Sequence, residues 1–206
     1  MTHRVVSACI LIVLCLLILR GPPLLFSILS LCVLARSAYE IFSLPSARSG
    51  RTGWLCAAFF LMVCGGILCL MILRVREGER SLLAWLIAVV CTGDISAYGI
   101  GSWIGGPKIF PHTSPHKTWS GSLGGVACAT VVGGFWCPIA DQVNPFILSI
   151  GVALAGVLGD YVESFVKRRL AVKDFGFLIP GHGGVLDRID SLLLAALFLC
   201  GILCRM

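Results

Sequence analysis

Charged residues are scarce in this chain, at 13% of its 206 residues, whereas about 25% is typical of a soluble domain. The sequence also lacks the short segments of alternating apolar and polar residues that a membrane β-barrel would require. It has neither a basic helix nor a soluble region that could hold duplex DNA, so nucleic acid is not an expected partner. These absences exclude an ordinary soluble domain and favour a membrane protein built from helices.

Cysteine is plentiful, but the spacings that would make it informative are missing. None of the eleven cysteines belongs to a Cys-x-x-Cys pair, so a zinc site is not indicated. Nearly all of them lie within apolar runs, as Cys15, Cys64 and Cys200 do. Cysteine behaves there as a small apolar residue. We therefore expect free thiols rather than a disulfide framework.

Long apolar runs account for most of the chain, of which 58% is hydrophobic. They predict an all-α, polytopic helical membrane protein with about seven transmembrane helices, because lipid-exposed backbone must satisfy its own hydrogen bonds. The expected spans are Val5–Leu19, Leu24–Phe42, Trp54–Leu73, Ser81–Ile100, Ser122–Ala140, Pro145–Val166 and Ile189–Cys204. Residues 1–80 form an N-terminal region of about three helices. Residues 81–206 form a second region with polar loops at 101–120 and 167–188.

The distribution of basic residues predicts the orientation of these spans. With the N-terminus in the cytoplasm, eleven of the sixteen Lys and Arg residues fall on the cytoplasmic side and five on the other. This excess agrees with the positive-inside rule. Both polar loops then face the cytoplasm and can meet there.

The stretch from Asp160 to Ser191 is the most polar part of the chain, with five of the ten acidic and five of the sixteen basic residues. If the sixth helix continues through Lys167, then Asp160, Glu163 or Ser164, and Lys167 share one face. Asp187 and Asp190, three residues apart, share one face at the start of the last helix.

Together with Asp94, which the fourth span carries, these aspartates could place four carboxylates near one membrane surface. Converging carboxylates favour a hard cation such as Mg²⁺. Asp94 alone could instead make a hydrogen bond between packed helices.

Basic residues alternate with these acids, and they suggest phosphate chemistry. Lys167, Arg168, Lys173 and Arg188 could hold phosphate oxygens beside an acid-bound Mg²⁺, the combination that phosphoryl or nucleotidyl transfer requires. The Gly-rich turn that ends at Gly184 could bring backbone N–H groups to a phosphate. His182, within this turn, could bind substrate or make a structural hydrogen bond.

Three segments resemble the phosphatidate cytidylyltransferases, also known as CDP-diacylglycerol synthases. The main one is Ser164-x-Val-Lys-Arg, four residues, Lys173-Asp-x-Gly, then Pro180-x-His-Gly-Gly-Val-x-Asp-Arg-Ile-Asp190. Gly93-Asp-x-x-Ala-Tyr-x-x-Gly101 and Ser114-Pro-x-Lys-Thr-Trp-x-Gly121 resemble two further segments of that family. In the last of these, His116 replaces a usual Lys and Ser120 a usual Glu, so no role is carried over to either position. The resemblance covers roughly residues 90 to 206.

This resemblance implies that CTP and phosphatidic acid are converted into CDP-diacylglycerol and pyrophosphate. It implies a catalytic group of Asp160, Lys167, Asp187 and Asp190, and metal ligands Asp94, Asp160, Asp187 and Asp190. The substrate phosphates would be bound by Ser114, Lys117, Thr118, Ser164, Arg168, Lys173, His182, Gly183, Gly184 and Arg188. It further implies Mg²⁺, with a second, monovalent cation such as K⁺, and a homodimer in a lipid bilayer. The expected location is a bacterial inner membrane, with the active site facing the cytoplasm.

Three other functions compete with this one. A CTP-dependent lipid kinase acting on a polyprenol would make a phosphorylated alcohol and CDP, but the full match over Ser164–Asp190 argues against it. A transporter with Asp94 and Asp160 as ion sites is the alternative from another class, and the hydropathy pattern shows no internal repeat to support it. An inactive homologue would not be expected to keep the acids and bases of the motif intact.

Overall fold

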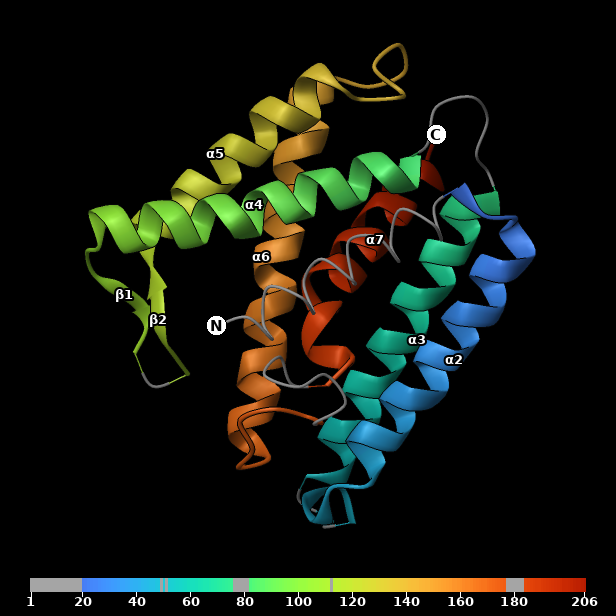
Figure 1. Ribbon diagram of the computed structural model, residues 1–206, viewed down its shortest axis with the longest axis vertical. Coiled ribbons are helices and arrows are strands. Elements are labelled where there is room, and N and C mark those ends of the chain that lie inside the picture. Colours follow the sequence, from blue (N-terminus) through green and yellow to red (C-terminus); the bar gives the residue numbers. More distant parts are fainter. Residues whose placement is uncertain (1–19, 49, 51, 76–81, 112, 177–183) are drawn as a thin grey trace.

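The computed structural model describes residues 20–48, 50, 52–75, 82–111, 113–176 and 184–206. Within these residues the fold consists of α-helices joined by turns, with one β-hairpin (Figure 1). In chain order the elements are α2 (Pro23–Phe42), the 3-10 helix η1 (Pro45–Arg48), α3 (Gly53–Val75), α4 (Leu82–Ile104), β1 (Lys108–Phe110), β2 (Ser114–Thr118), α5 (Trp119–Phe135), α6 (Pro145–Arg169), the 3-10 helix η2 (Leu186–Arg188) and α7 (Asp190–Leu203).

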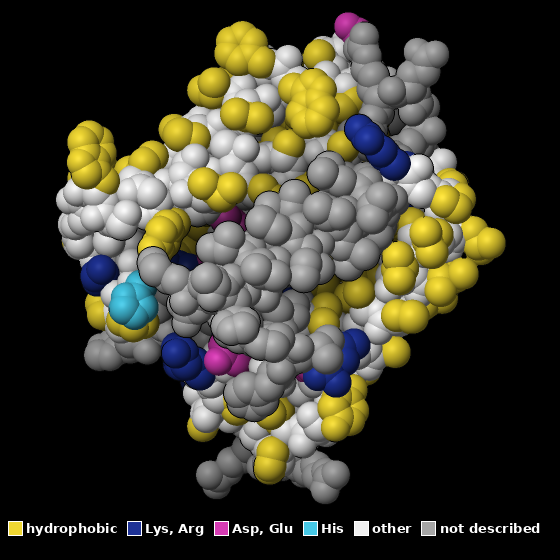
Figure 2. All heavy atoms as spheres, in the orientation of Figure 1, with side chains coloured by type: hydrophobic (Ala, Val, Ile, Leu, Met, Phe, Trp, Pro, Cys, Tyr) yellow, Lys and Arg dark blue, Asp and Glu magenta, His cyan; other side chains and the backbone are white. Residues whose placement is uncertain are grey.

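Four of these helices, α2, α3, α4 and α6, are long and apolar enough to cross a membrane. The prediction of a helical membrane protein is therefore confirmed. Hydrophobic side chains are spread over the upper part of the described surface in Figure 2 and gather at its right-hand edge, as expected for a surface that faces lipid. The expected count of about seven spans is not confirmed, because α5 has 17 residues, α7 has 14, and Val5–Leu19 lies outside the described residues.

The arrangement of the helices brings the two halves of the chain together. Helices α2 and α3 form an antiparallel pair, and α7 packs against both α3 and α6 (Figure 1). Helix α6 also packs against α5, which lies along α4. The 3-10 helix between α2 and α3 and residues 170–176, which follow α6, lie at one end of the molecule, opposite the α5–α6 connection (Figure 1). The nine cysteines that the structure describes are free.

The segment 101–120, expected as a loop, contains regular structure instead. Helix α4 continues to Ile104 and ends where Gly105 and Gly106 adopt positive φ angles of 67° and 109°, which glycine tolerates. Strands β1 and β2 then pair antiparallel, with Lys108 opposite Thr118. The Gly-Gly-Pro sequence after α4 therefore ends the helix and starts a hairpin.

Local capping sets the bounds of α5 and α6. The Thr118 hydroxyl accepts the N–H of Gly121 at 3.1 Å, so the last residue of β2 begins α5. Helix α5 ends at Phe135 instead of reaching residue 140, since Pro138 disfavours helical backbone in the residue before it. At α6 the Asn144 side chain caps two backbone N–H groups, and a proline occupies the first turn.

Glycines let α4 and α5 approach closely. A Cβ atom at Gly125 would lie 2.6 Å from the carbonyl oxygen of Gly93 and 2.8 Å from the Cβ of Ala97. At the far end of the same contact, the indole N–H of the fully buried Trp85 donates to the Gly133 carbonyl at 2.8 Å. Small residues at a helix contact favour association within a membrane.

We expect Gly125→Ala to separate α4 from α5 and to lower the stability by about 1–3 kcal/mol, as overpacking does. Gly99→Ala is the matched control, because a Cβ atom there meets nothing within 4 Å. Thermal unfolding in detergent micelles measures both. Equal unfolding midpoints for the two variants would contradict the proposed close contact.

Candidate active site

Three carboxylates from α6 and α7 converge inside the helix bundle. One oxygen each of Asp160, Glu163 and Asp190 lies within 4.8 Å of the other two. Glu163 is 1% exposed and Asp190 is 9% exposed, while Asp160 is half-buried. Asp160 and Glu163 share one face of α6, as their spacing of three residues predicts. The sequence predicts Glu163 on this face but not as a metal ligand, so its place in the cluster is a finding of the structure.

The close approach of α7 to α6 brings Asp190 into this cluster. A Cβ atom at Gly159 would lie 2.6 Å from the backbone carbonyl oxygen of Asp190 and 3.2 Å from the Cα atom of Ser191. Glycine at this position therefore allows the first turn of α7 to contact α6 directly. The cluster depends on this contact, since Asp190 is the first residue of α7.

The ammonium group of Lys167, whose side chain is 13% exposed, connects α6 with the segment before α7. Lys167 Nζ lies 2.9 Å from Glu163 Oε2 and 3.0 Å from Asp187 Oδ1. The second oxygen of Asp187 accepts the backbone N–H groups of Gly184, at 2.7 Å, and Phe175, at 3.2 Å. Asp187 therefore lies outside the three-carboxylate cluster, and both of its oxygens are bound by groups of the protein.

The cluster also contains a polar atom without a donor. Glu163 Oε1 is buried and has no hydrogen-bond partner among the described residues. A buried carboxylate oxygen in this state is costly unless it receives a positive charge or a donor. Oxygen ligands of this kind suit a hard divalent cation. The arrangement of Asp160, Glu163 and Asp190 therefore fits a bound metal ion.

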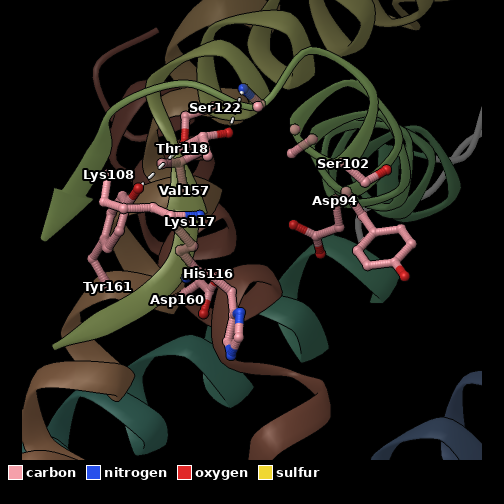
Figure 3. A pocket seen from close by; sticks show the side chains of 15 residues that line it. Asp94, Ser102, Lys108, His116, Lys117, Thr118, Ser122, Val157, Asp160 and Tyr161 are labelled. Carbon is pink, nitrogen blue, oxygen red and sulfur yellow. Dashed lines mark hydrogen bonds and ion pairs between the residues drawn. The ribbon is translucent and has the colours of Figure 1, made fainter. Parts of the chain in front are cut away.

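A cavity of about 620 Å³ lies next to the cluster. Its lining comes from α4, β2, the start of α5 and the polar face of α6. Figure 3 shows Asp94 reaching into it from α4, on the wall opposite Lys117 and Asp160. The cavity therefore joins two of the expected acidic positions through one open space. His116 also lines it.

Strand β2 places Lys117 at the boundary between the cavity and the cluster. Its ammonium group forms an ion pair with Asp160 and lies 4.5 Å from the centroid of the Tyr161 ring. The Tyr161 hydroxyl lies 3.2 Å from the Ser122 hydroxyl, and its ring packs edge-on against Phe110 of β1. The Tyr161 ring therefore packs against the Lys117 ammonium group, a contact that the sequence did not reveal.

The remaining expected site residues do not all lie at the cavity. Thr118 lines the cavity and caps α5, while Ser114 is half-buried at the start of β2. Arg168 donates from Nε to the Thr113 carbonyl at 3.1 Å, which ties the hairpin turn to α6. Ser164 is half-buried, Lys173 and Arg188 are exposed, and Gly184 is buried. His182 and Gly183 lie outside the described residues.

The sequence of this chain is similar to that of one protein family and several of its members. Residues 46–205 match the family described as the cytidylyltransferase family. A phosphatidate cytidylyltransferase of Brucella abortus is 40% identical over 158 residues, which cover 74% of this chain and 57% of that protein. One from Helicobacter pylori is 43% identical over 121 residues, covering 57% and 45%. One from Mycobacterium leprae is 37% identical over 124 residues, covering 59% and 39%. The chain spans about half the length of these relatives.

Replacing Lys167 by Met should destabilise the protein by about 3–5 kcal/mol, because two buried carboxylates then lose their shared cation. Lys173→Met is the control, since Lys173 is exposed, and a change within about 0.5 kcal/mol is expected there. Unfolding in a denaturant series reports both values. A Lys167→Met protein as stable as the wild type would show that this ammonium group does not hold the site together.

Proposed function

The chain belongs to the cytidylyltransferase family, and from this membership we propose that it transfers the cytidylyl group of CTP to phosphatidic acid. The products are CDP-diacylglycerol and pyrophosphate. The observation that carries the proposal is the group of Asp160, Glu163 and Asp190 beside a cavity of about 620 Å³ that Lys117 also lines. The relatives named phosphatidate cytidylyltransferase support the choice of acceptor.

The reaction needs little covalent chemistry from the protein. A phosphate oxygen of phosphatidic acid attacks the α-phosphorus of CTP, and the bond from that phosphorus to the bridging oxygen of pyrophosphate breaks. The attacking phosphate monoester is already anionic near neutral pH, so no strong general base is required. The protein contributes positioning and neutralisation of charge on the phosphates.

We assign Mg²⁺ to the carboxylates of Asp160, Glu163 and Asp190, where the buried Glu163 Oε1 has no donor within the described residues. When bound, Mg²⁺ neutralises phosphate oxygens and stabilises the departing pyrophosphate. Asp187, also expected as a ligand, is assigned instead to holding Lys167. Asp94, across the cavity, remains a proposed further ligand or organiser of the metal site, and a second, monovalent cation such as K⁺ remains part of the proposal.

Basic and hydroxyl side chains complete the proposed substrate site. Lys117 and Thr118 line the cavity where the triphosphate would lie next to the acids. Arg168, Lys173 and Arg188 lie at the end of α6 and before α7, where they can receive the phosphate of the lipid. Ser114, Ser164 and Gly184, together with His182 and Gly183, remain proposed contacts of the phosphates.

The membrane helices account for the choice of a lipid substrate. The acyl chains of phosphatidic acid would remain in the bilayer beside α4 and α6 while its phosphate reaches the carboxylates. The charge distribution of the sequence supports a site that faces the cytoplasm, and a bacterial inner membrane remains the proposed location. A homodimer is the assembly that the family resemblance implies, and we retain it as part of the proposal.

Transfer of label from [α-³²P]CTP into a chloroform-soluble product tests the reaction directly. Purified protein with phosphatidic acid and Mg²⁺ should label the lipid, and Asp190→Asn should reduce the rate at least about 100-fold, since several kcal/mol of charge stabilisation are lost. Asp141→Asn, in the exposed turn between α5 and α6, should leave the rate unchanged.

Label that stays in the aqueous phase, with [γ-³²P]CTP labelling a lipid alcohol instead, would replace the proposal by a CTP-dependent lipid kinase. Absence of transfer from either label in folded protein would contradict both functions. Equal activity of the Asp190→Asn and Asp141→Asn proteins would contradict the assigned location of the site.

The Mg²⁺ dependence of the same reaction tests the ligand set. Glu163→Gln removes one anionic ligand, so the Mg²⁺ concentration for half-maximal rate should rise at least about tenfold. Asp141→Asn again serves as the control and should keep the wild-type value. A Glu163→Gln protein that retains the wild-type Mg²⁺ midpoint would exclude Glu163 as a ligand.

A further inference from the structure

An acidic side chain from the N-terminal half of the chain lies against residues 184–186, the segment of the proposed active site that precedes Asp187. Glu40 belongs to α2, before residue 46 where the match to the family begins. It is 1% exposed. Its Oε1 atom accepts the backbone N–H of Val185 at 3.1 Å, and its Oε2 atom accepts that of Leu186 at 3.2 Å. The site therefore contains a contact between residues 145 positions apart in the chain.

Two glycines form the space that the Glu40 carboxylate occupies. A Cβ atom at Gly176 would lie 2.6 Å from Glu40 Oε1, and one at Gly184 would lie 2.5 Å from Glu40 Oε2. Neither position could carry a side chain without moving the carboxylate. The space thus fits a carboxylate whose two oxygens receive adjacent backbone N–H groups.

The same backbone segment also determines where Asp187 lies. The N–H of Gly184 donates to Asp187 Oδ2, while the next two N–H groups donate to Glu40. Three consecutive backbone donors are thus fixed by two carboxylates on different elements. Because Asp187 in turn accepts from Lys167 Nζ at 3.0 Å, a shift of the 184–186 backbone would move Lys167 relative to Glu163.

A salt bridge alone does not explain why Glu40 is buried here. Arg36 donates from Nε to Glu40 Oε1 at 3.1 Å, but the Arg36 side chain is 31% exposed and could be solvated without this partner. Burying a carboxylate in an apolar bundle is costly unless several donors receive it. The additional donors that receive the Glu40 carboxylate are the backbone N–H groups of Val185 and Leu186.

We infer that Glu40 is a positioning residue of the active site, which holds the 184–186 backbone so that Asp187 keeps Lys167 beside Glu163. The inference rests on the proposed cytidylyl transfer for its effect on rate. Its first step, the anchoring of residues 184–186, does not depend on that reaction. Glu40 would touch neither substrate nor cation.

Two measurements on Glu40→Gln in the full chain test this role. Gln keeps the size of Glu but presents an amide N–H₂ to one of the two backbone donors. Hydrogen–deuterium exchange of the amides at 184–188 should become at least about tenfold faster. The kcat for cytidylyl transfer should fall at least about tenfold, because misplacement by about 1 Å can cost 100-fold, while the KM for CTP changes less than about threefold.

Matched variants separate positioning from general stability. Gly176→Ala keeps the Glu40 charge but pushes on its carboxylate, so it should reproduce the fall in kcat. Ser37→Ala alters a fully buried side chain of the same helix, and Gly201→Ala adds a Cβ atom that meets nothing within 4 Å. Both controls should keep the wild-type kcat and exchange rates.

Wild-type kcat in Glu40→Gln protein, or faster exchange spread evenly over α2 and α3 without a maximum at 184–188, would overturn the inference. A rise in the KM for CTP with unchanged kcat would also overturn it. If the wild-type protein transfers no cytidylyl group, the proposed function fails. The exchange rates at 184–188 then decide by themselves whether Glu40 anchors this segment.

Discussion

The contacts of one largely shielded ammonium group determine how the elements of the candidate site fit together. Lys167 joins Glu163 on α6 to Asp187 in the segment that leads into α7. A buried ion pair that loses one partner leaves an uncompensated charge, so its members must stay in register. The start of α7 is thereby held against α6, and Asp190 enters the group formed with Asp160 and Glu163. The stability of the fold and the proposed binding of a cation consequently depend on the same contact.

Long apolar runs predicted much of the helical fold, because such runs have few alternatives to a helix in lipid. The expected spans that overlap α2, α3, α4 and α6 correspond to helices of sufficient length to cross a membrane. The residues around the hairpin were harder to interpret. Polar residues at 108–118 have the composition of a loop, and their pairing depends on contacts from Phe110 to Tyr161 and from Arg168 to Thr113, which local sequence does not encode.

The candidate site was predictable where its residues share one helix face. Asp160 and Lys167 follow helical spacing, and the structure places Asp160 within the three-carboxylate cluster and Lys167 beside it. The division of labour among the acids was not predictable, since it depends on which backbone N–H groups reach which oxygens. Asp187 receives two of them, whereas Glu163 Oε1 receives none within the described residues. Glu40 could have been noticed as the acidic residue of the expected span Leu24–Phe42, because an acidic residue within a membrane span usually has a specific role.

The central claim is that Asp160, Glu163 and Asp190 form a cation site next to the nucleotide cavity. Anomalous scattering from Mn²⁺ in crystals grown with CTP would test it most directly, because Mn²⁺ accepts the same oxygen ligands as Mg²⁺. The account predicts an anomalous peak bounded by these three carboxylates, with CTP phosphate density beside Lys117. A peak bound to other carboxylates, with this cluster empty at saturating Mn²⁺, would contradict it.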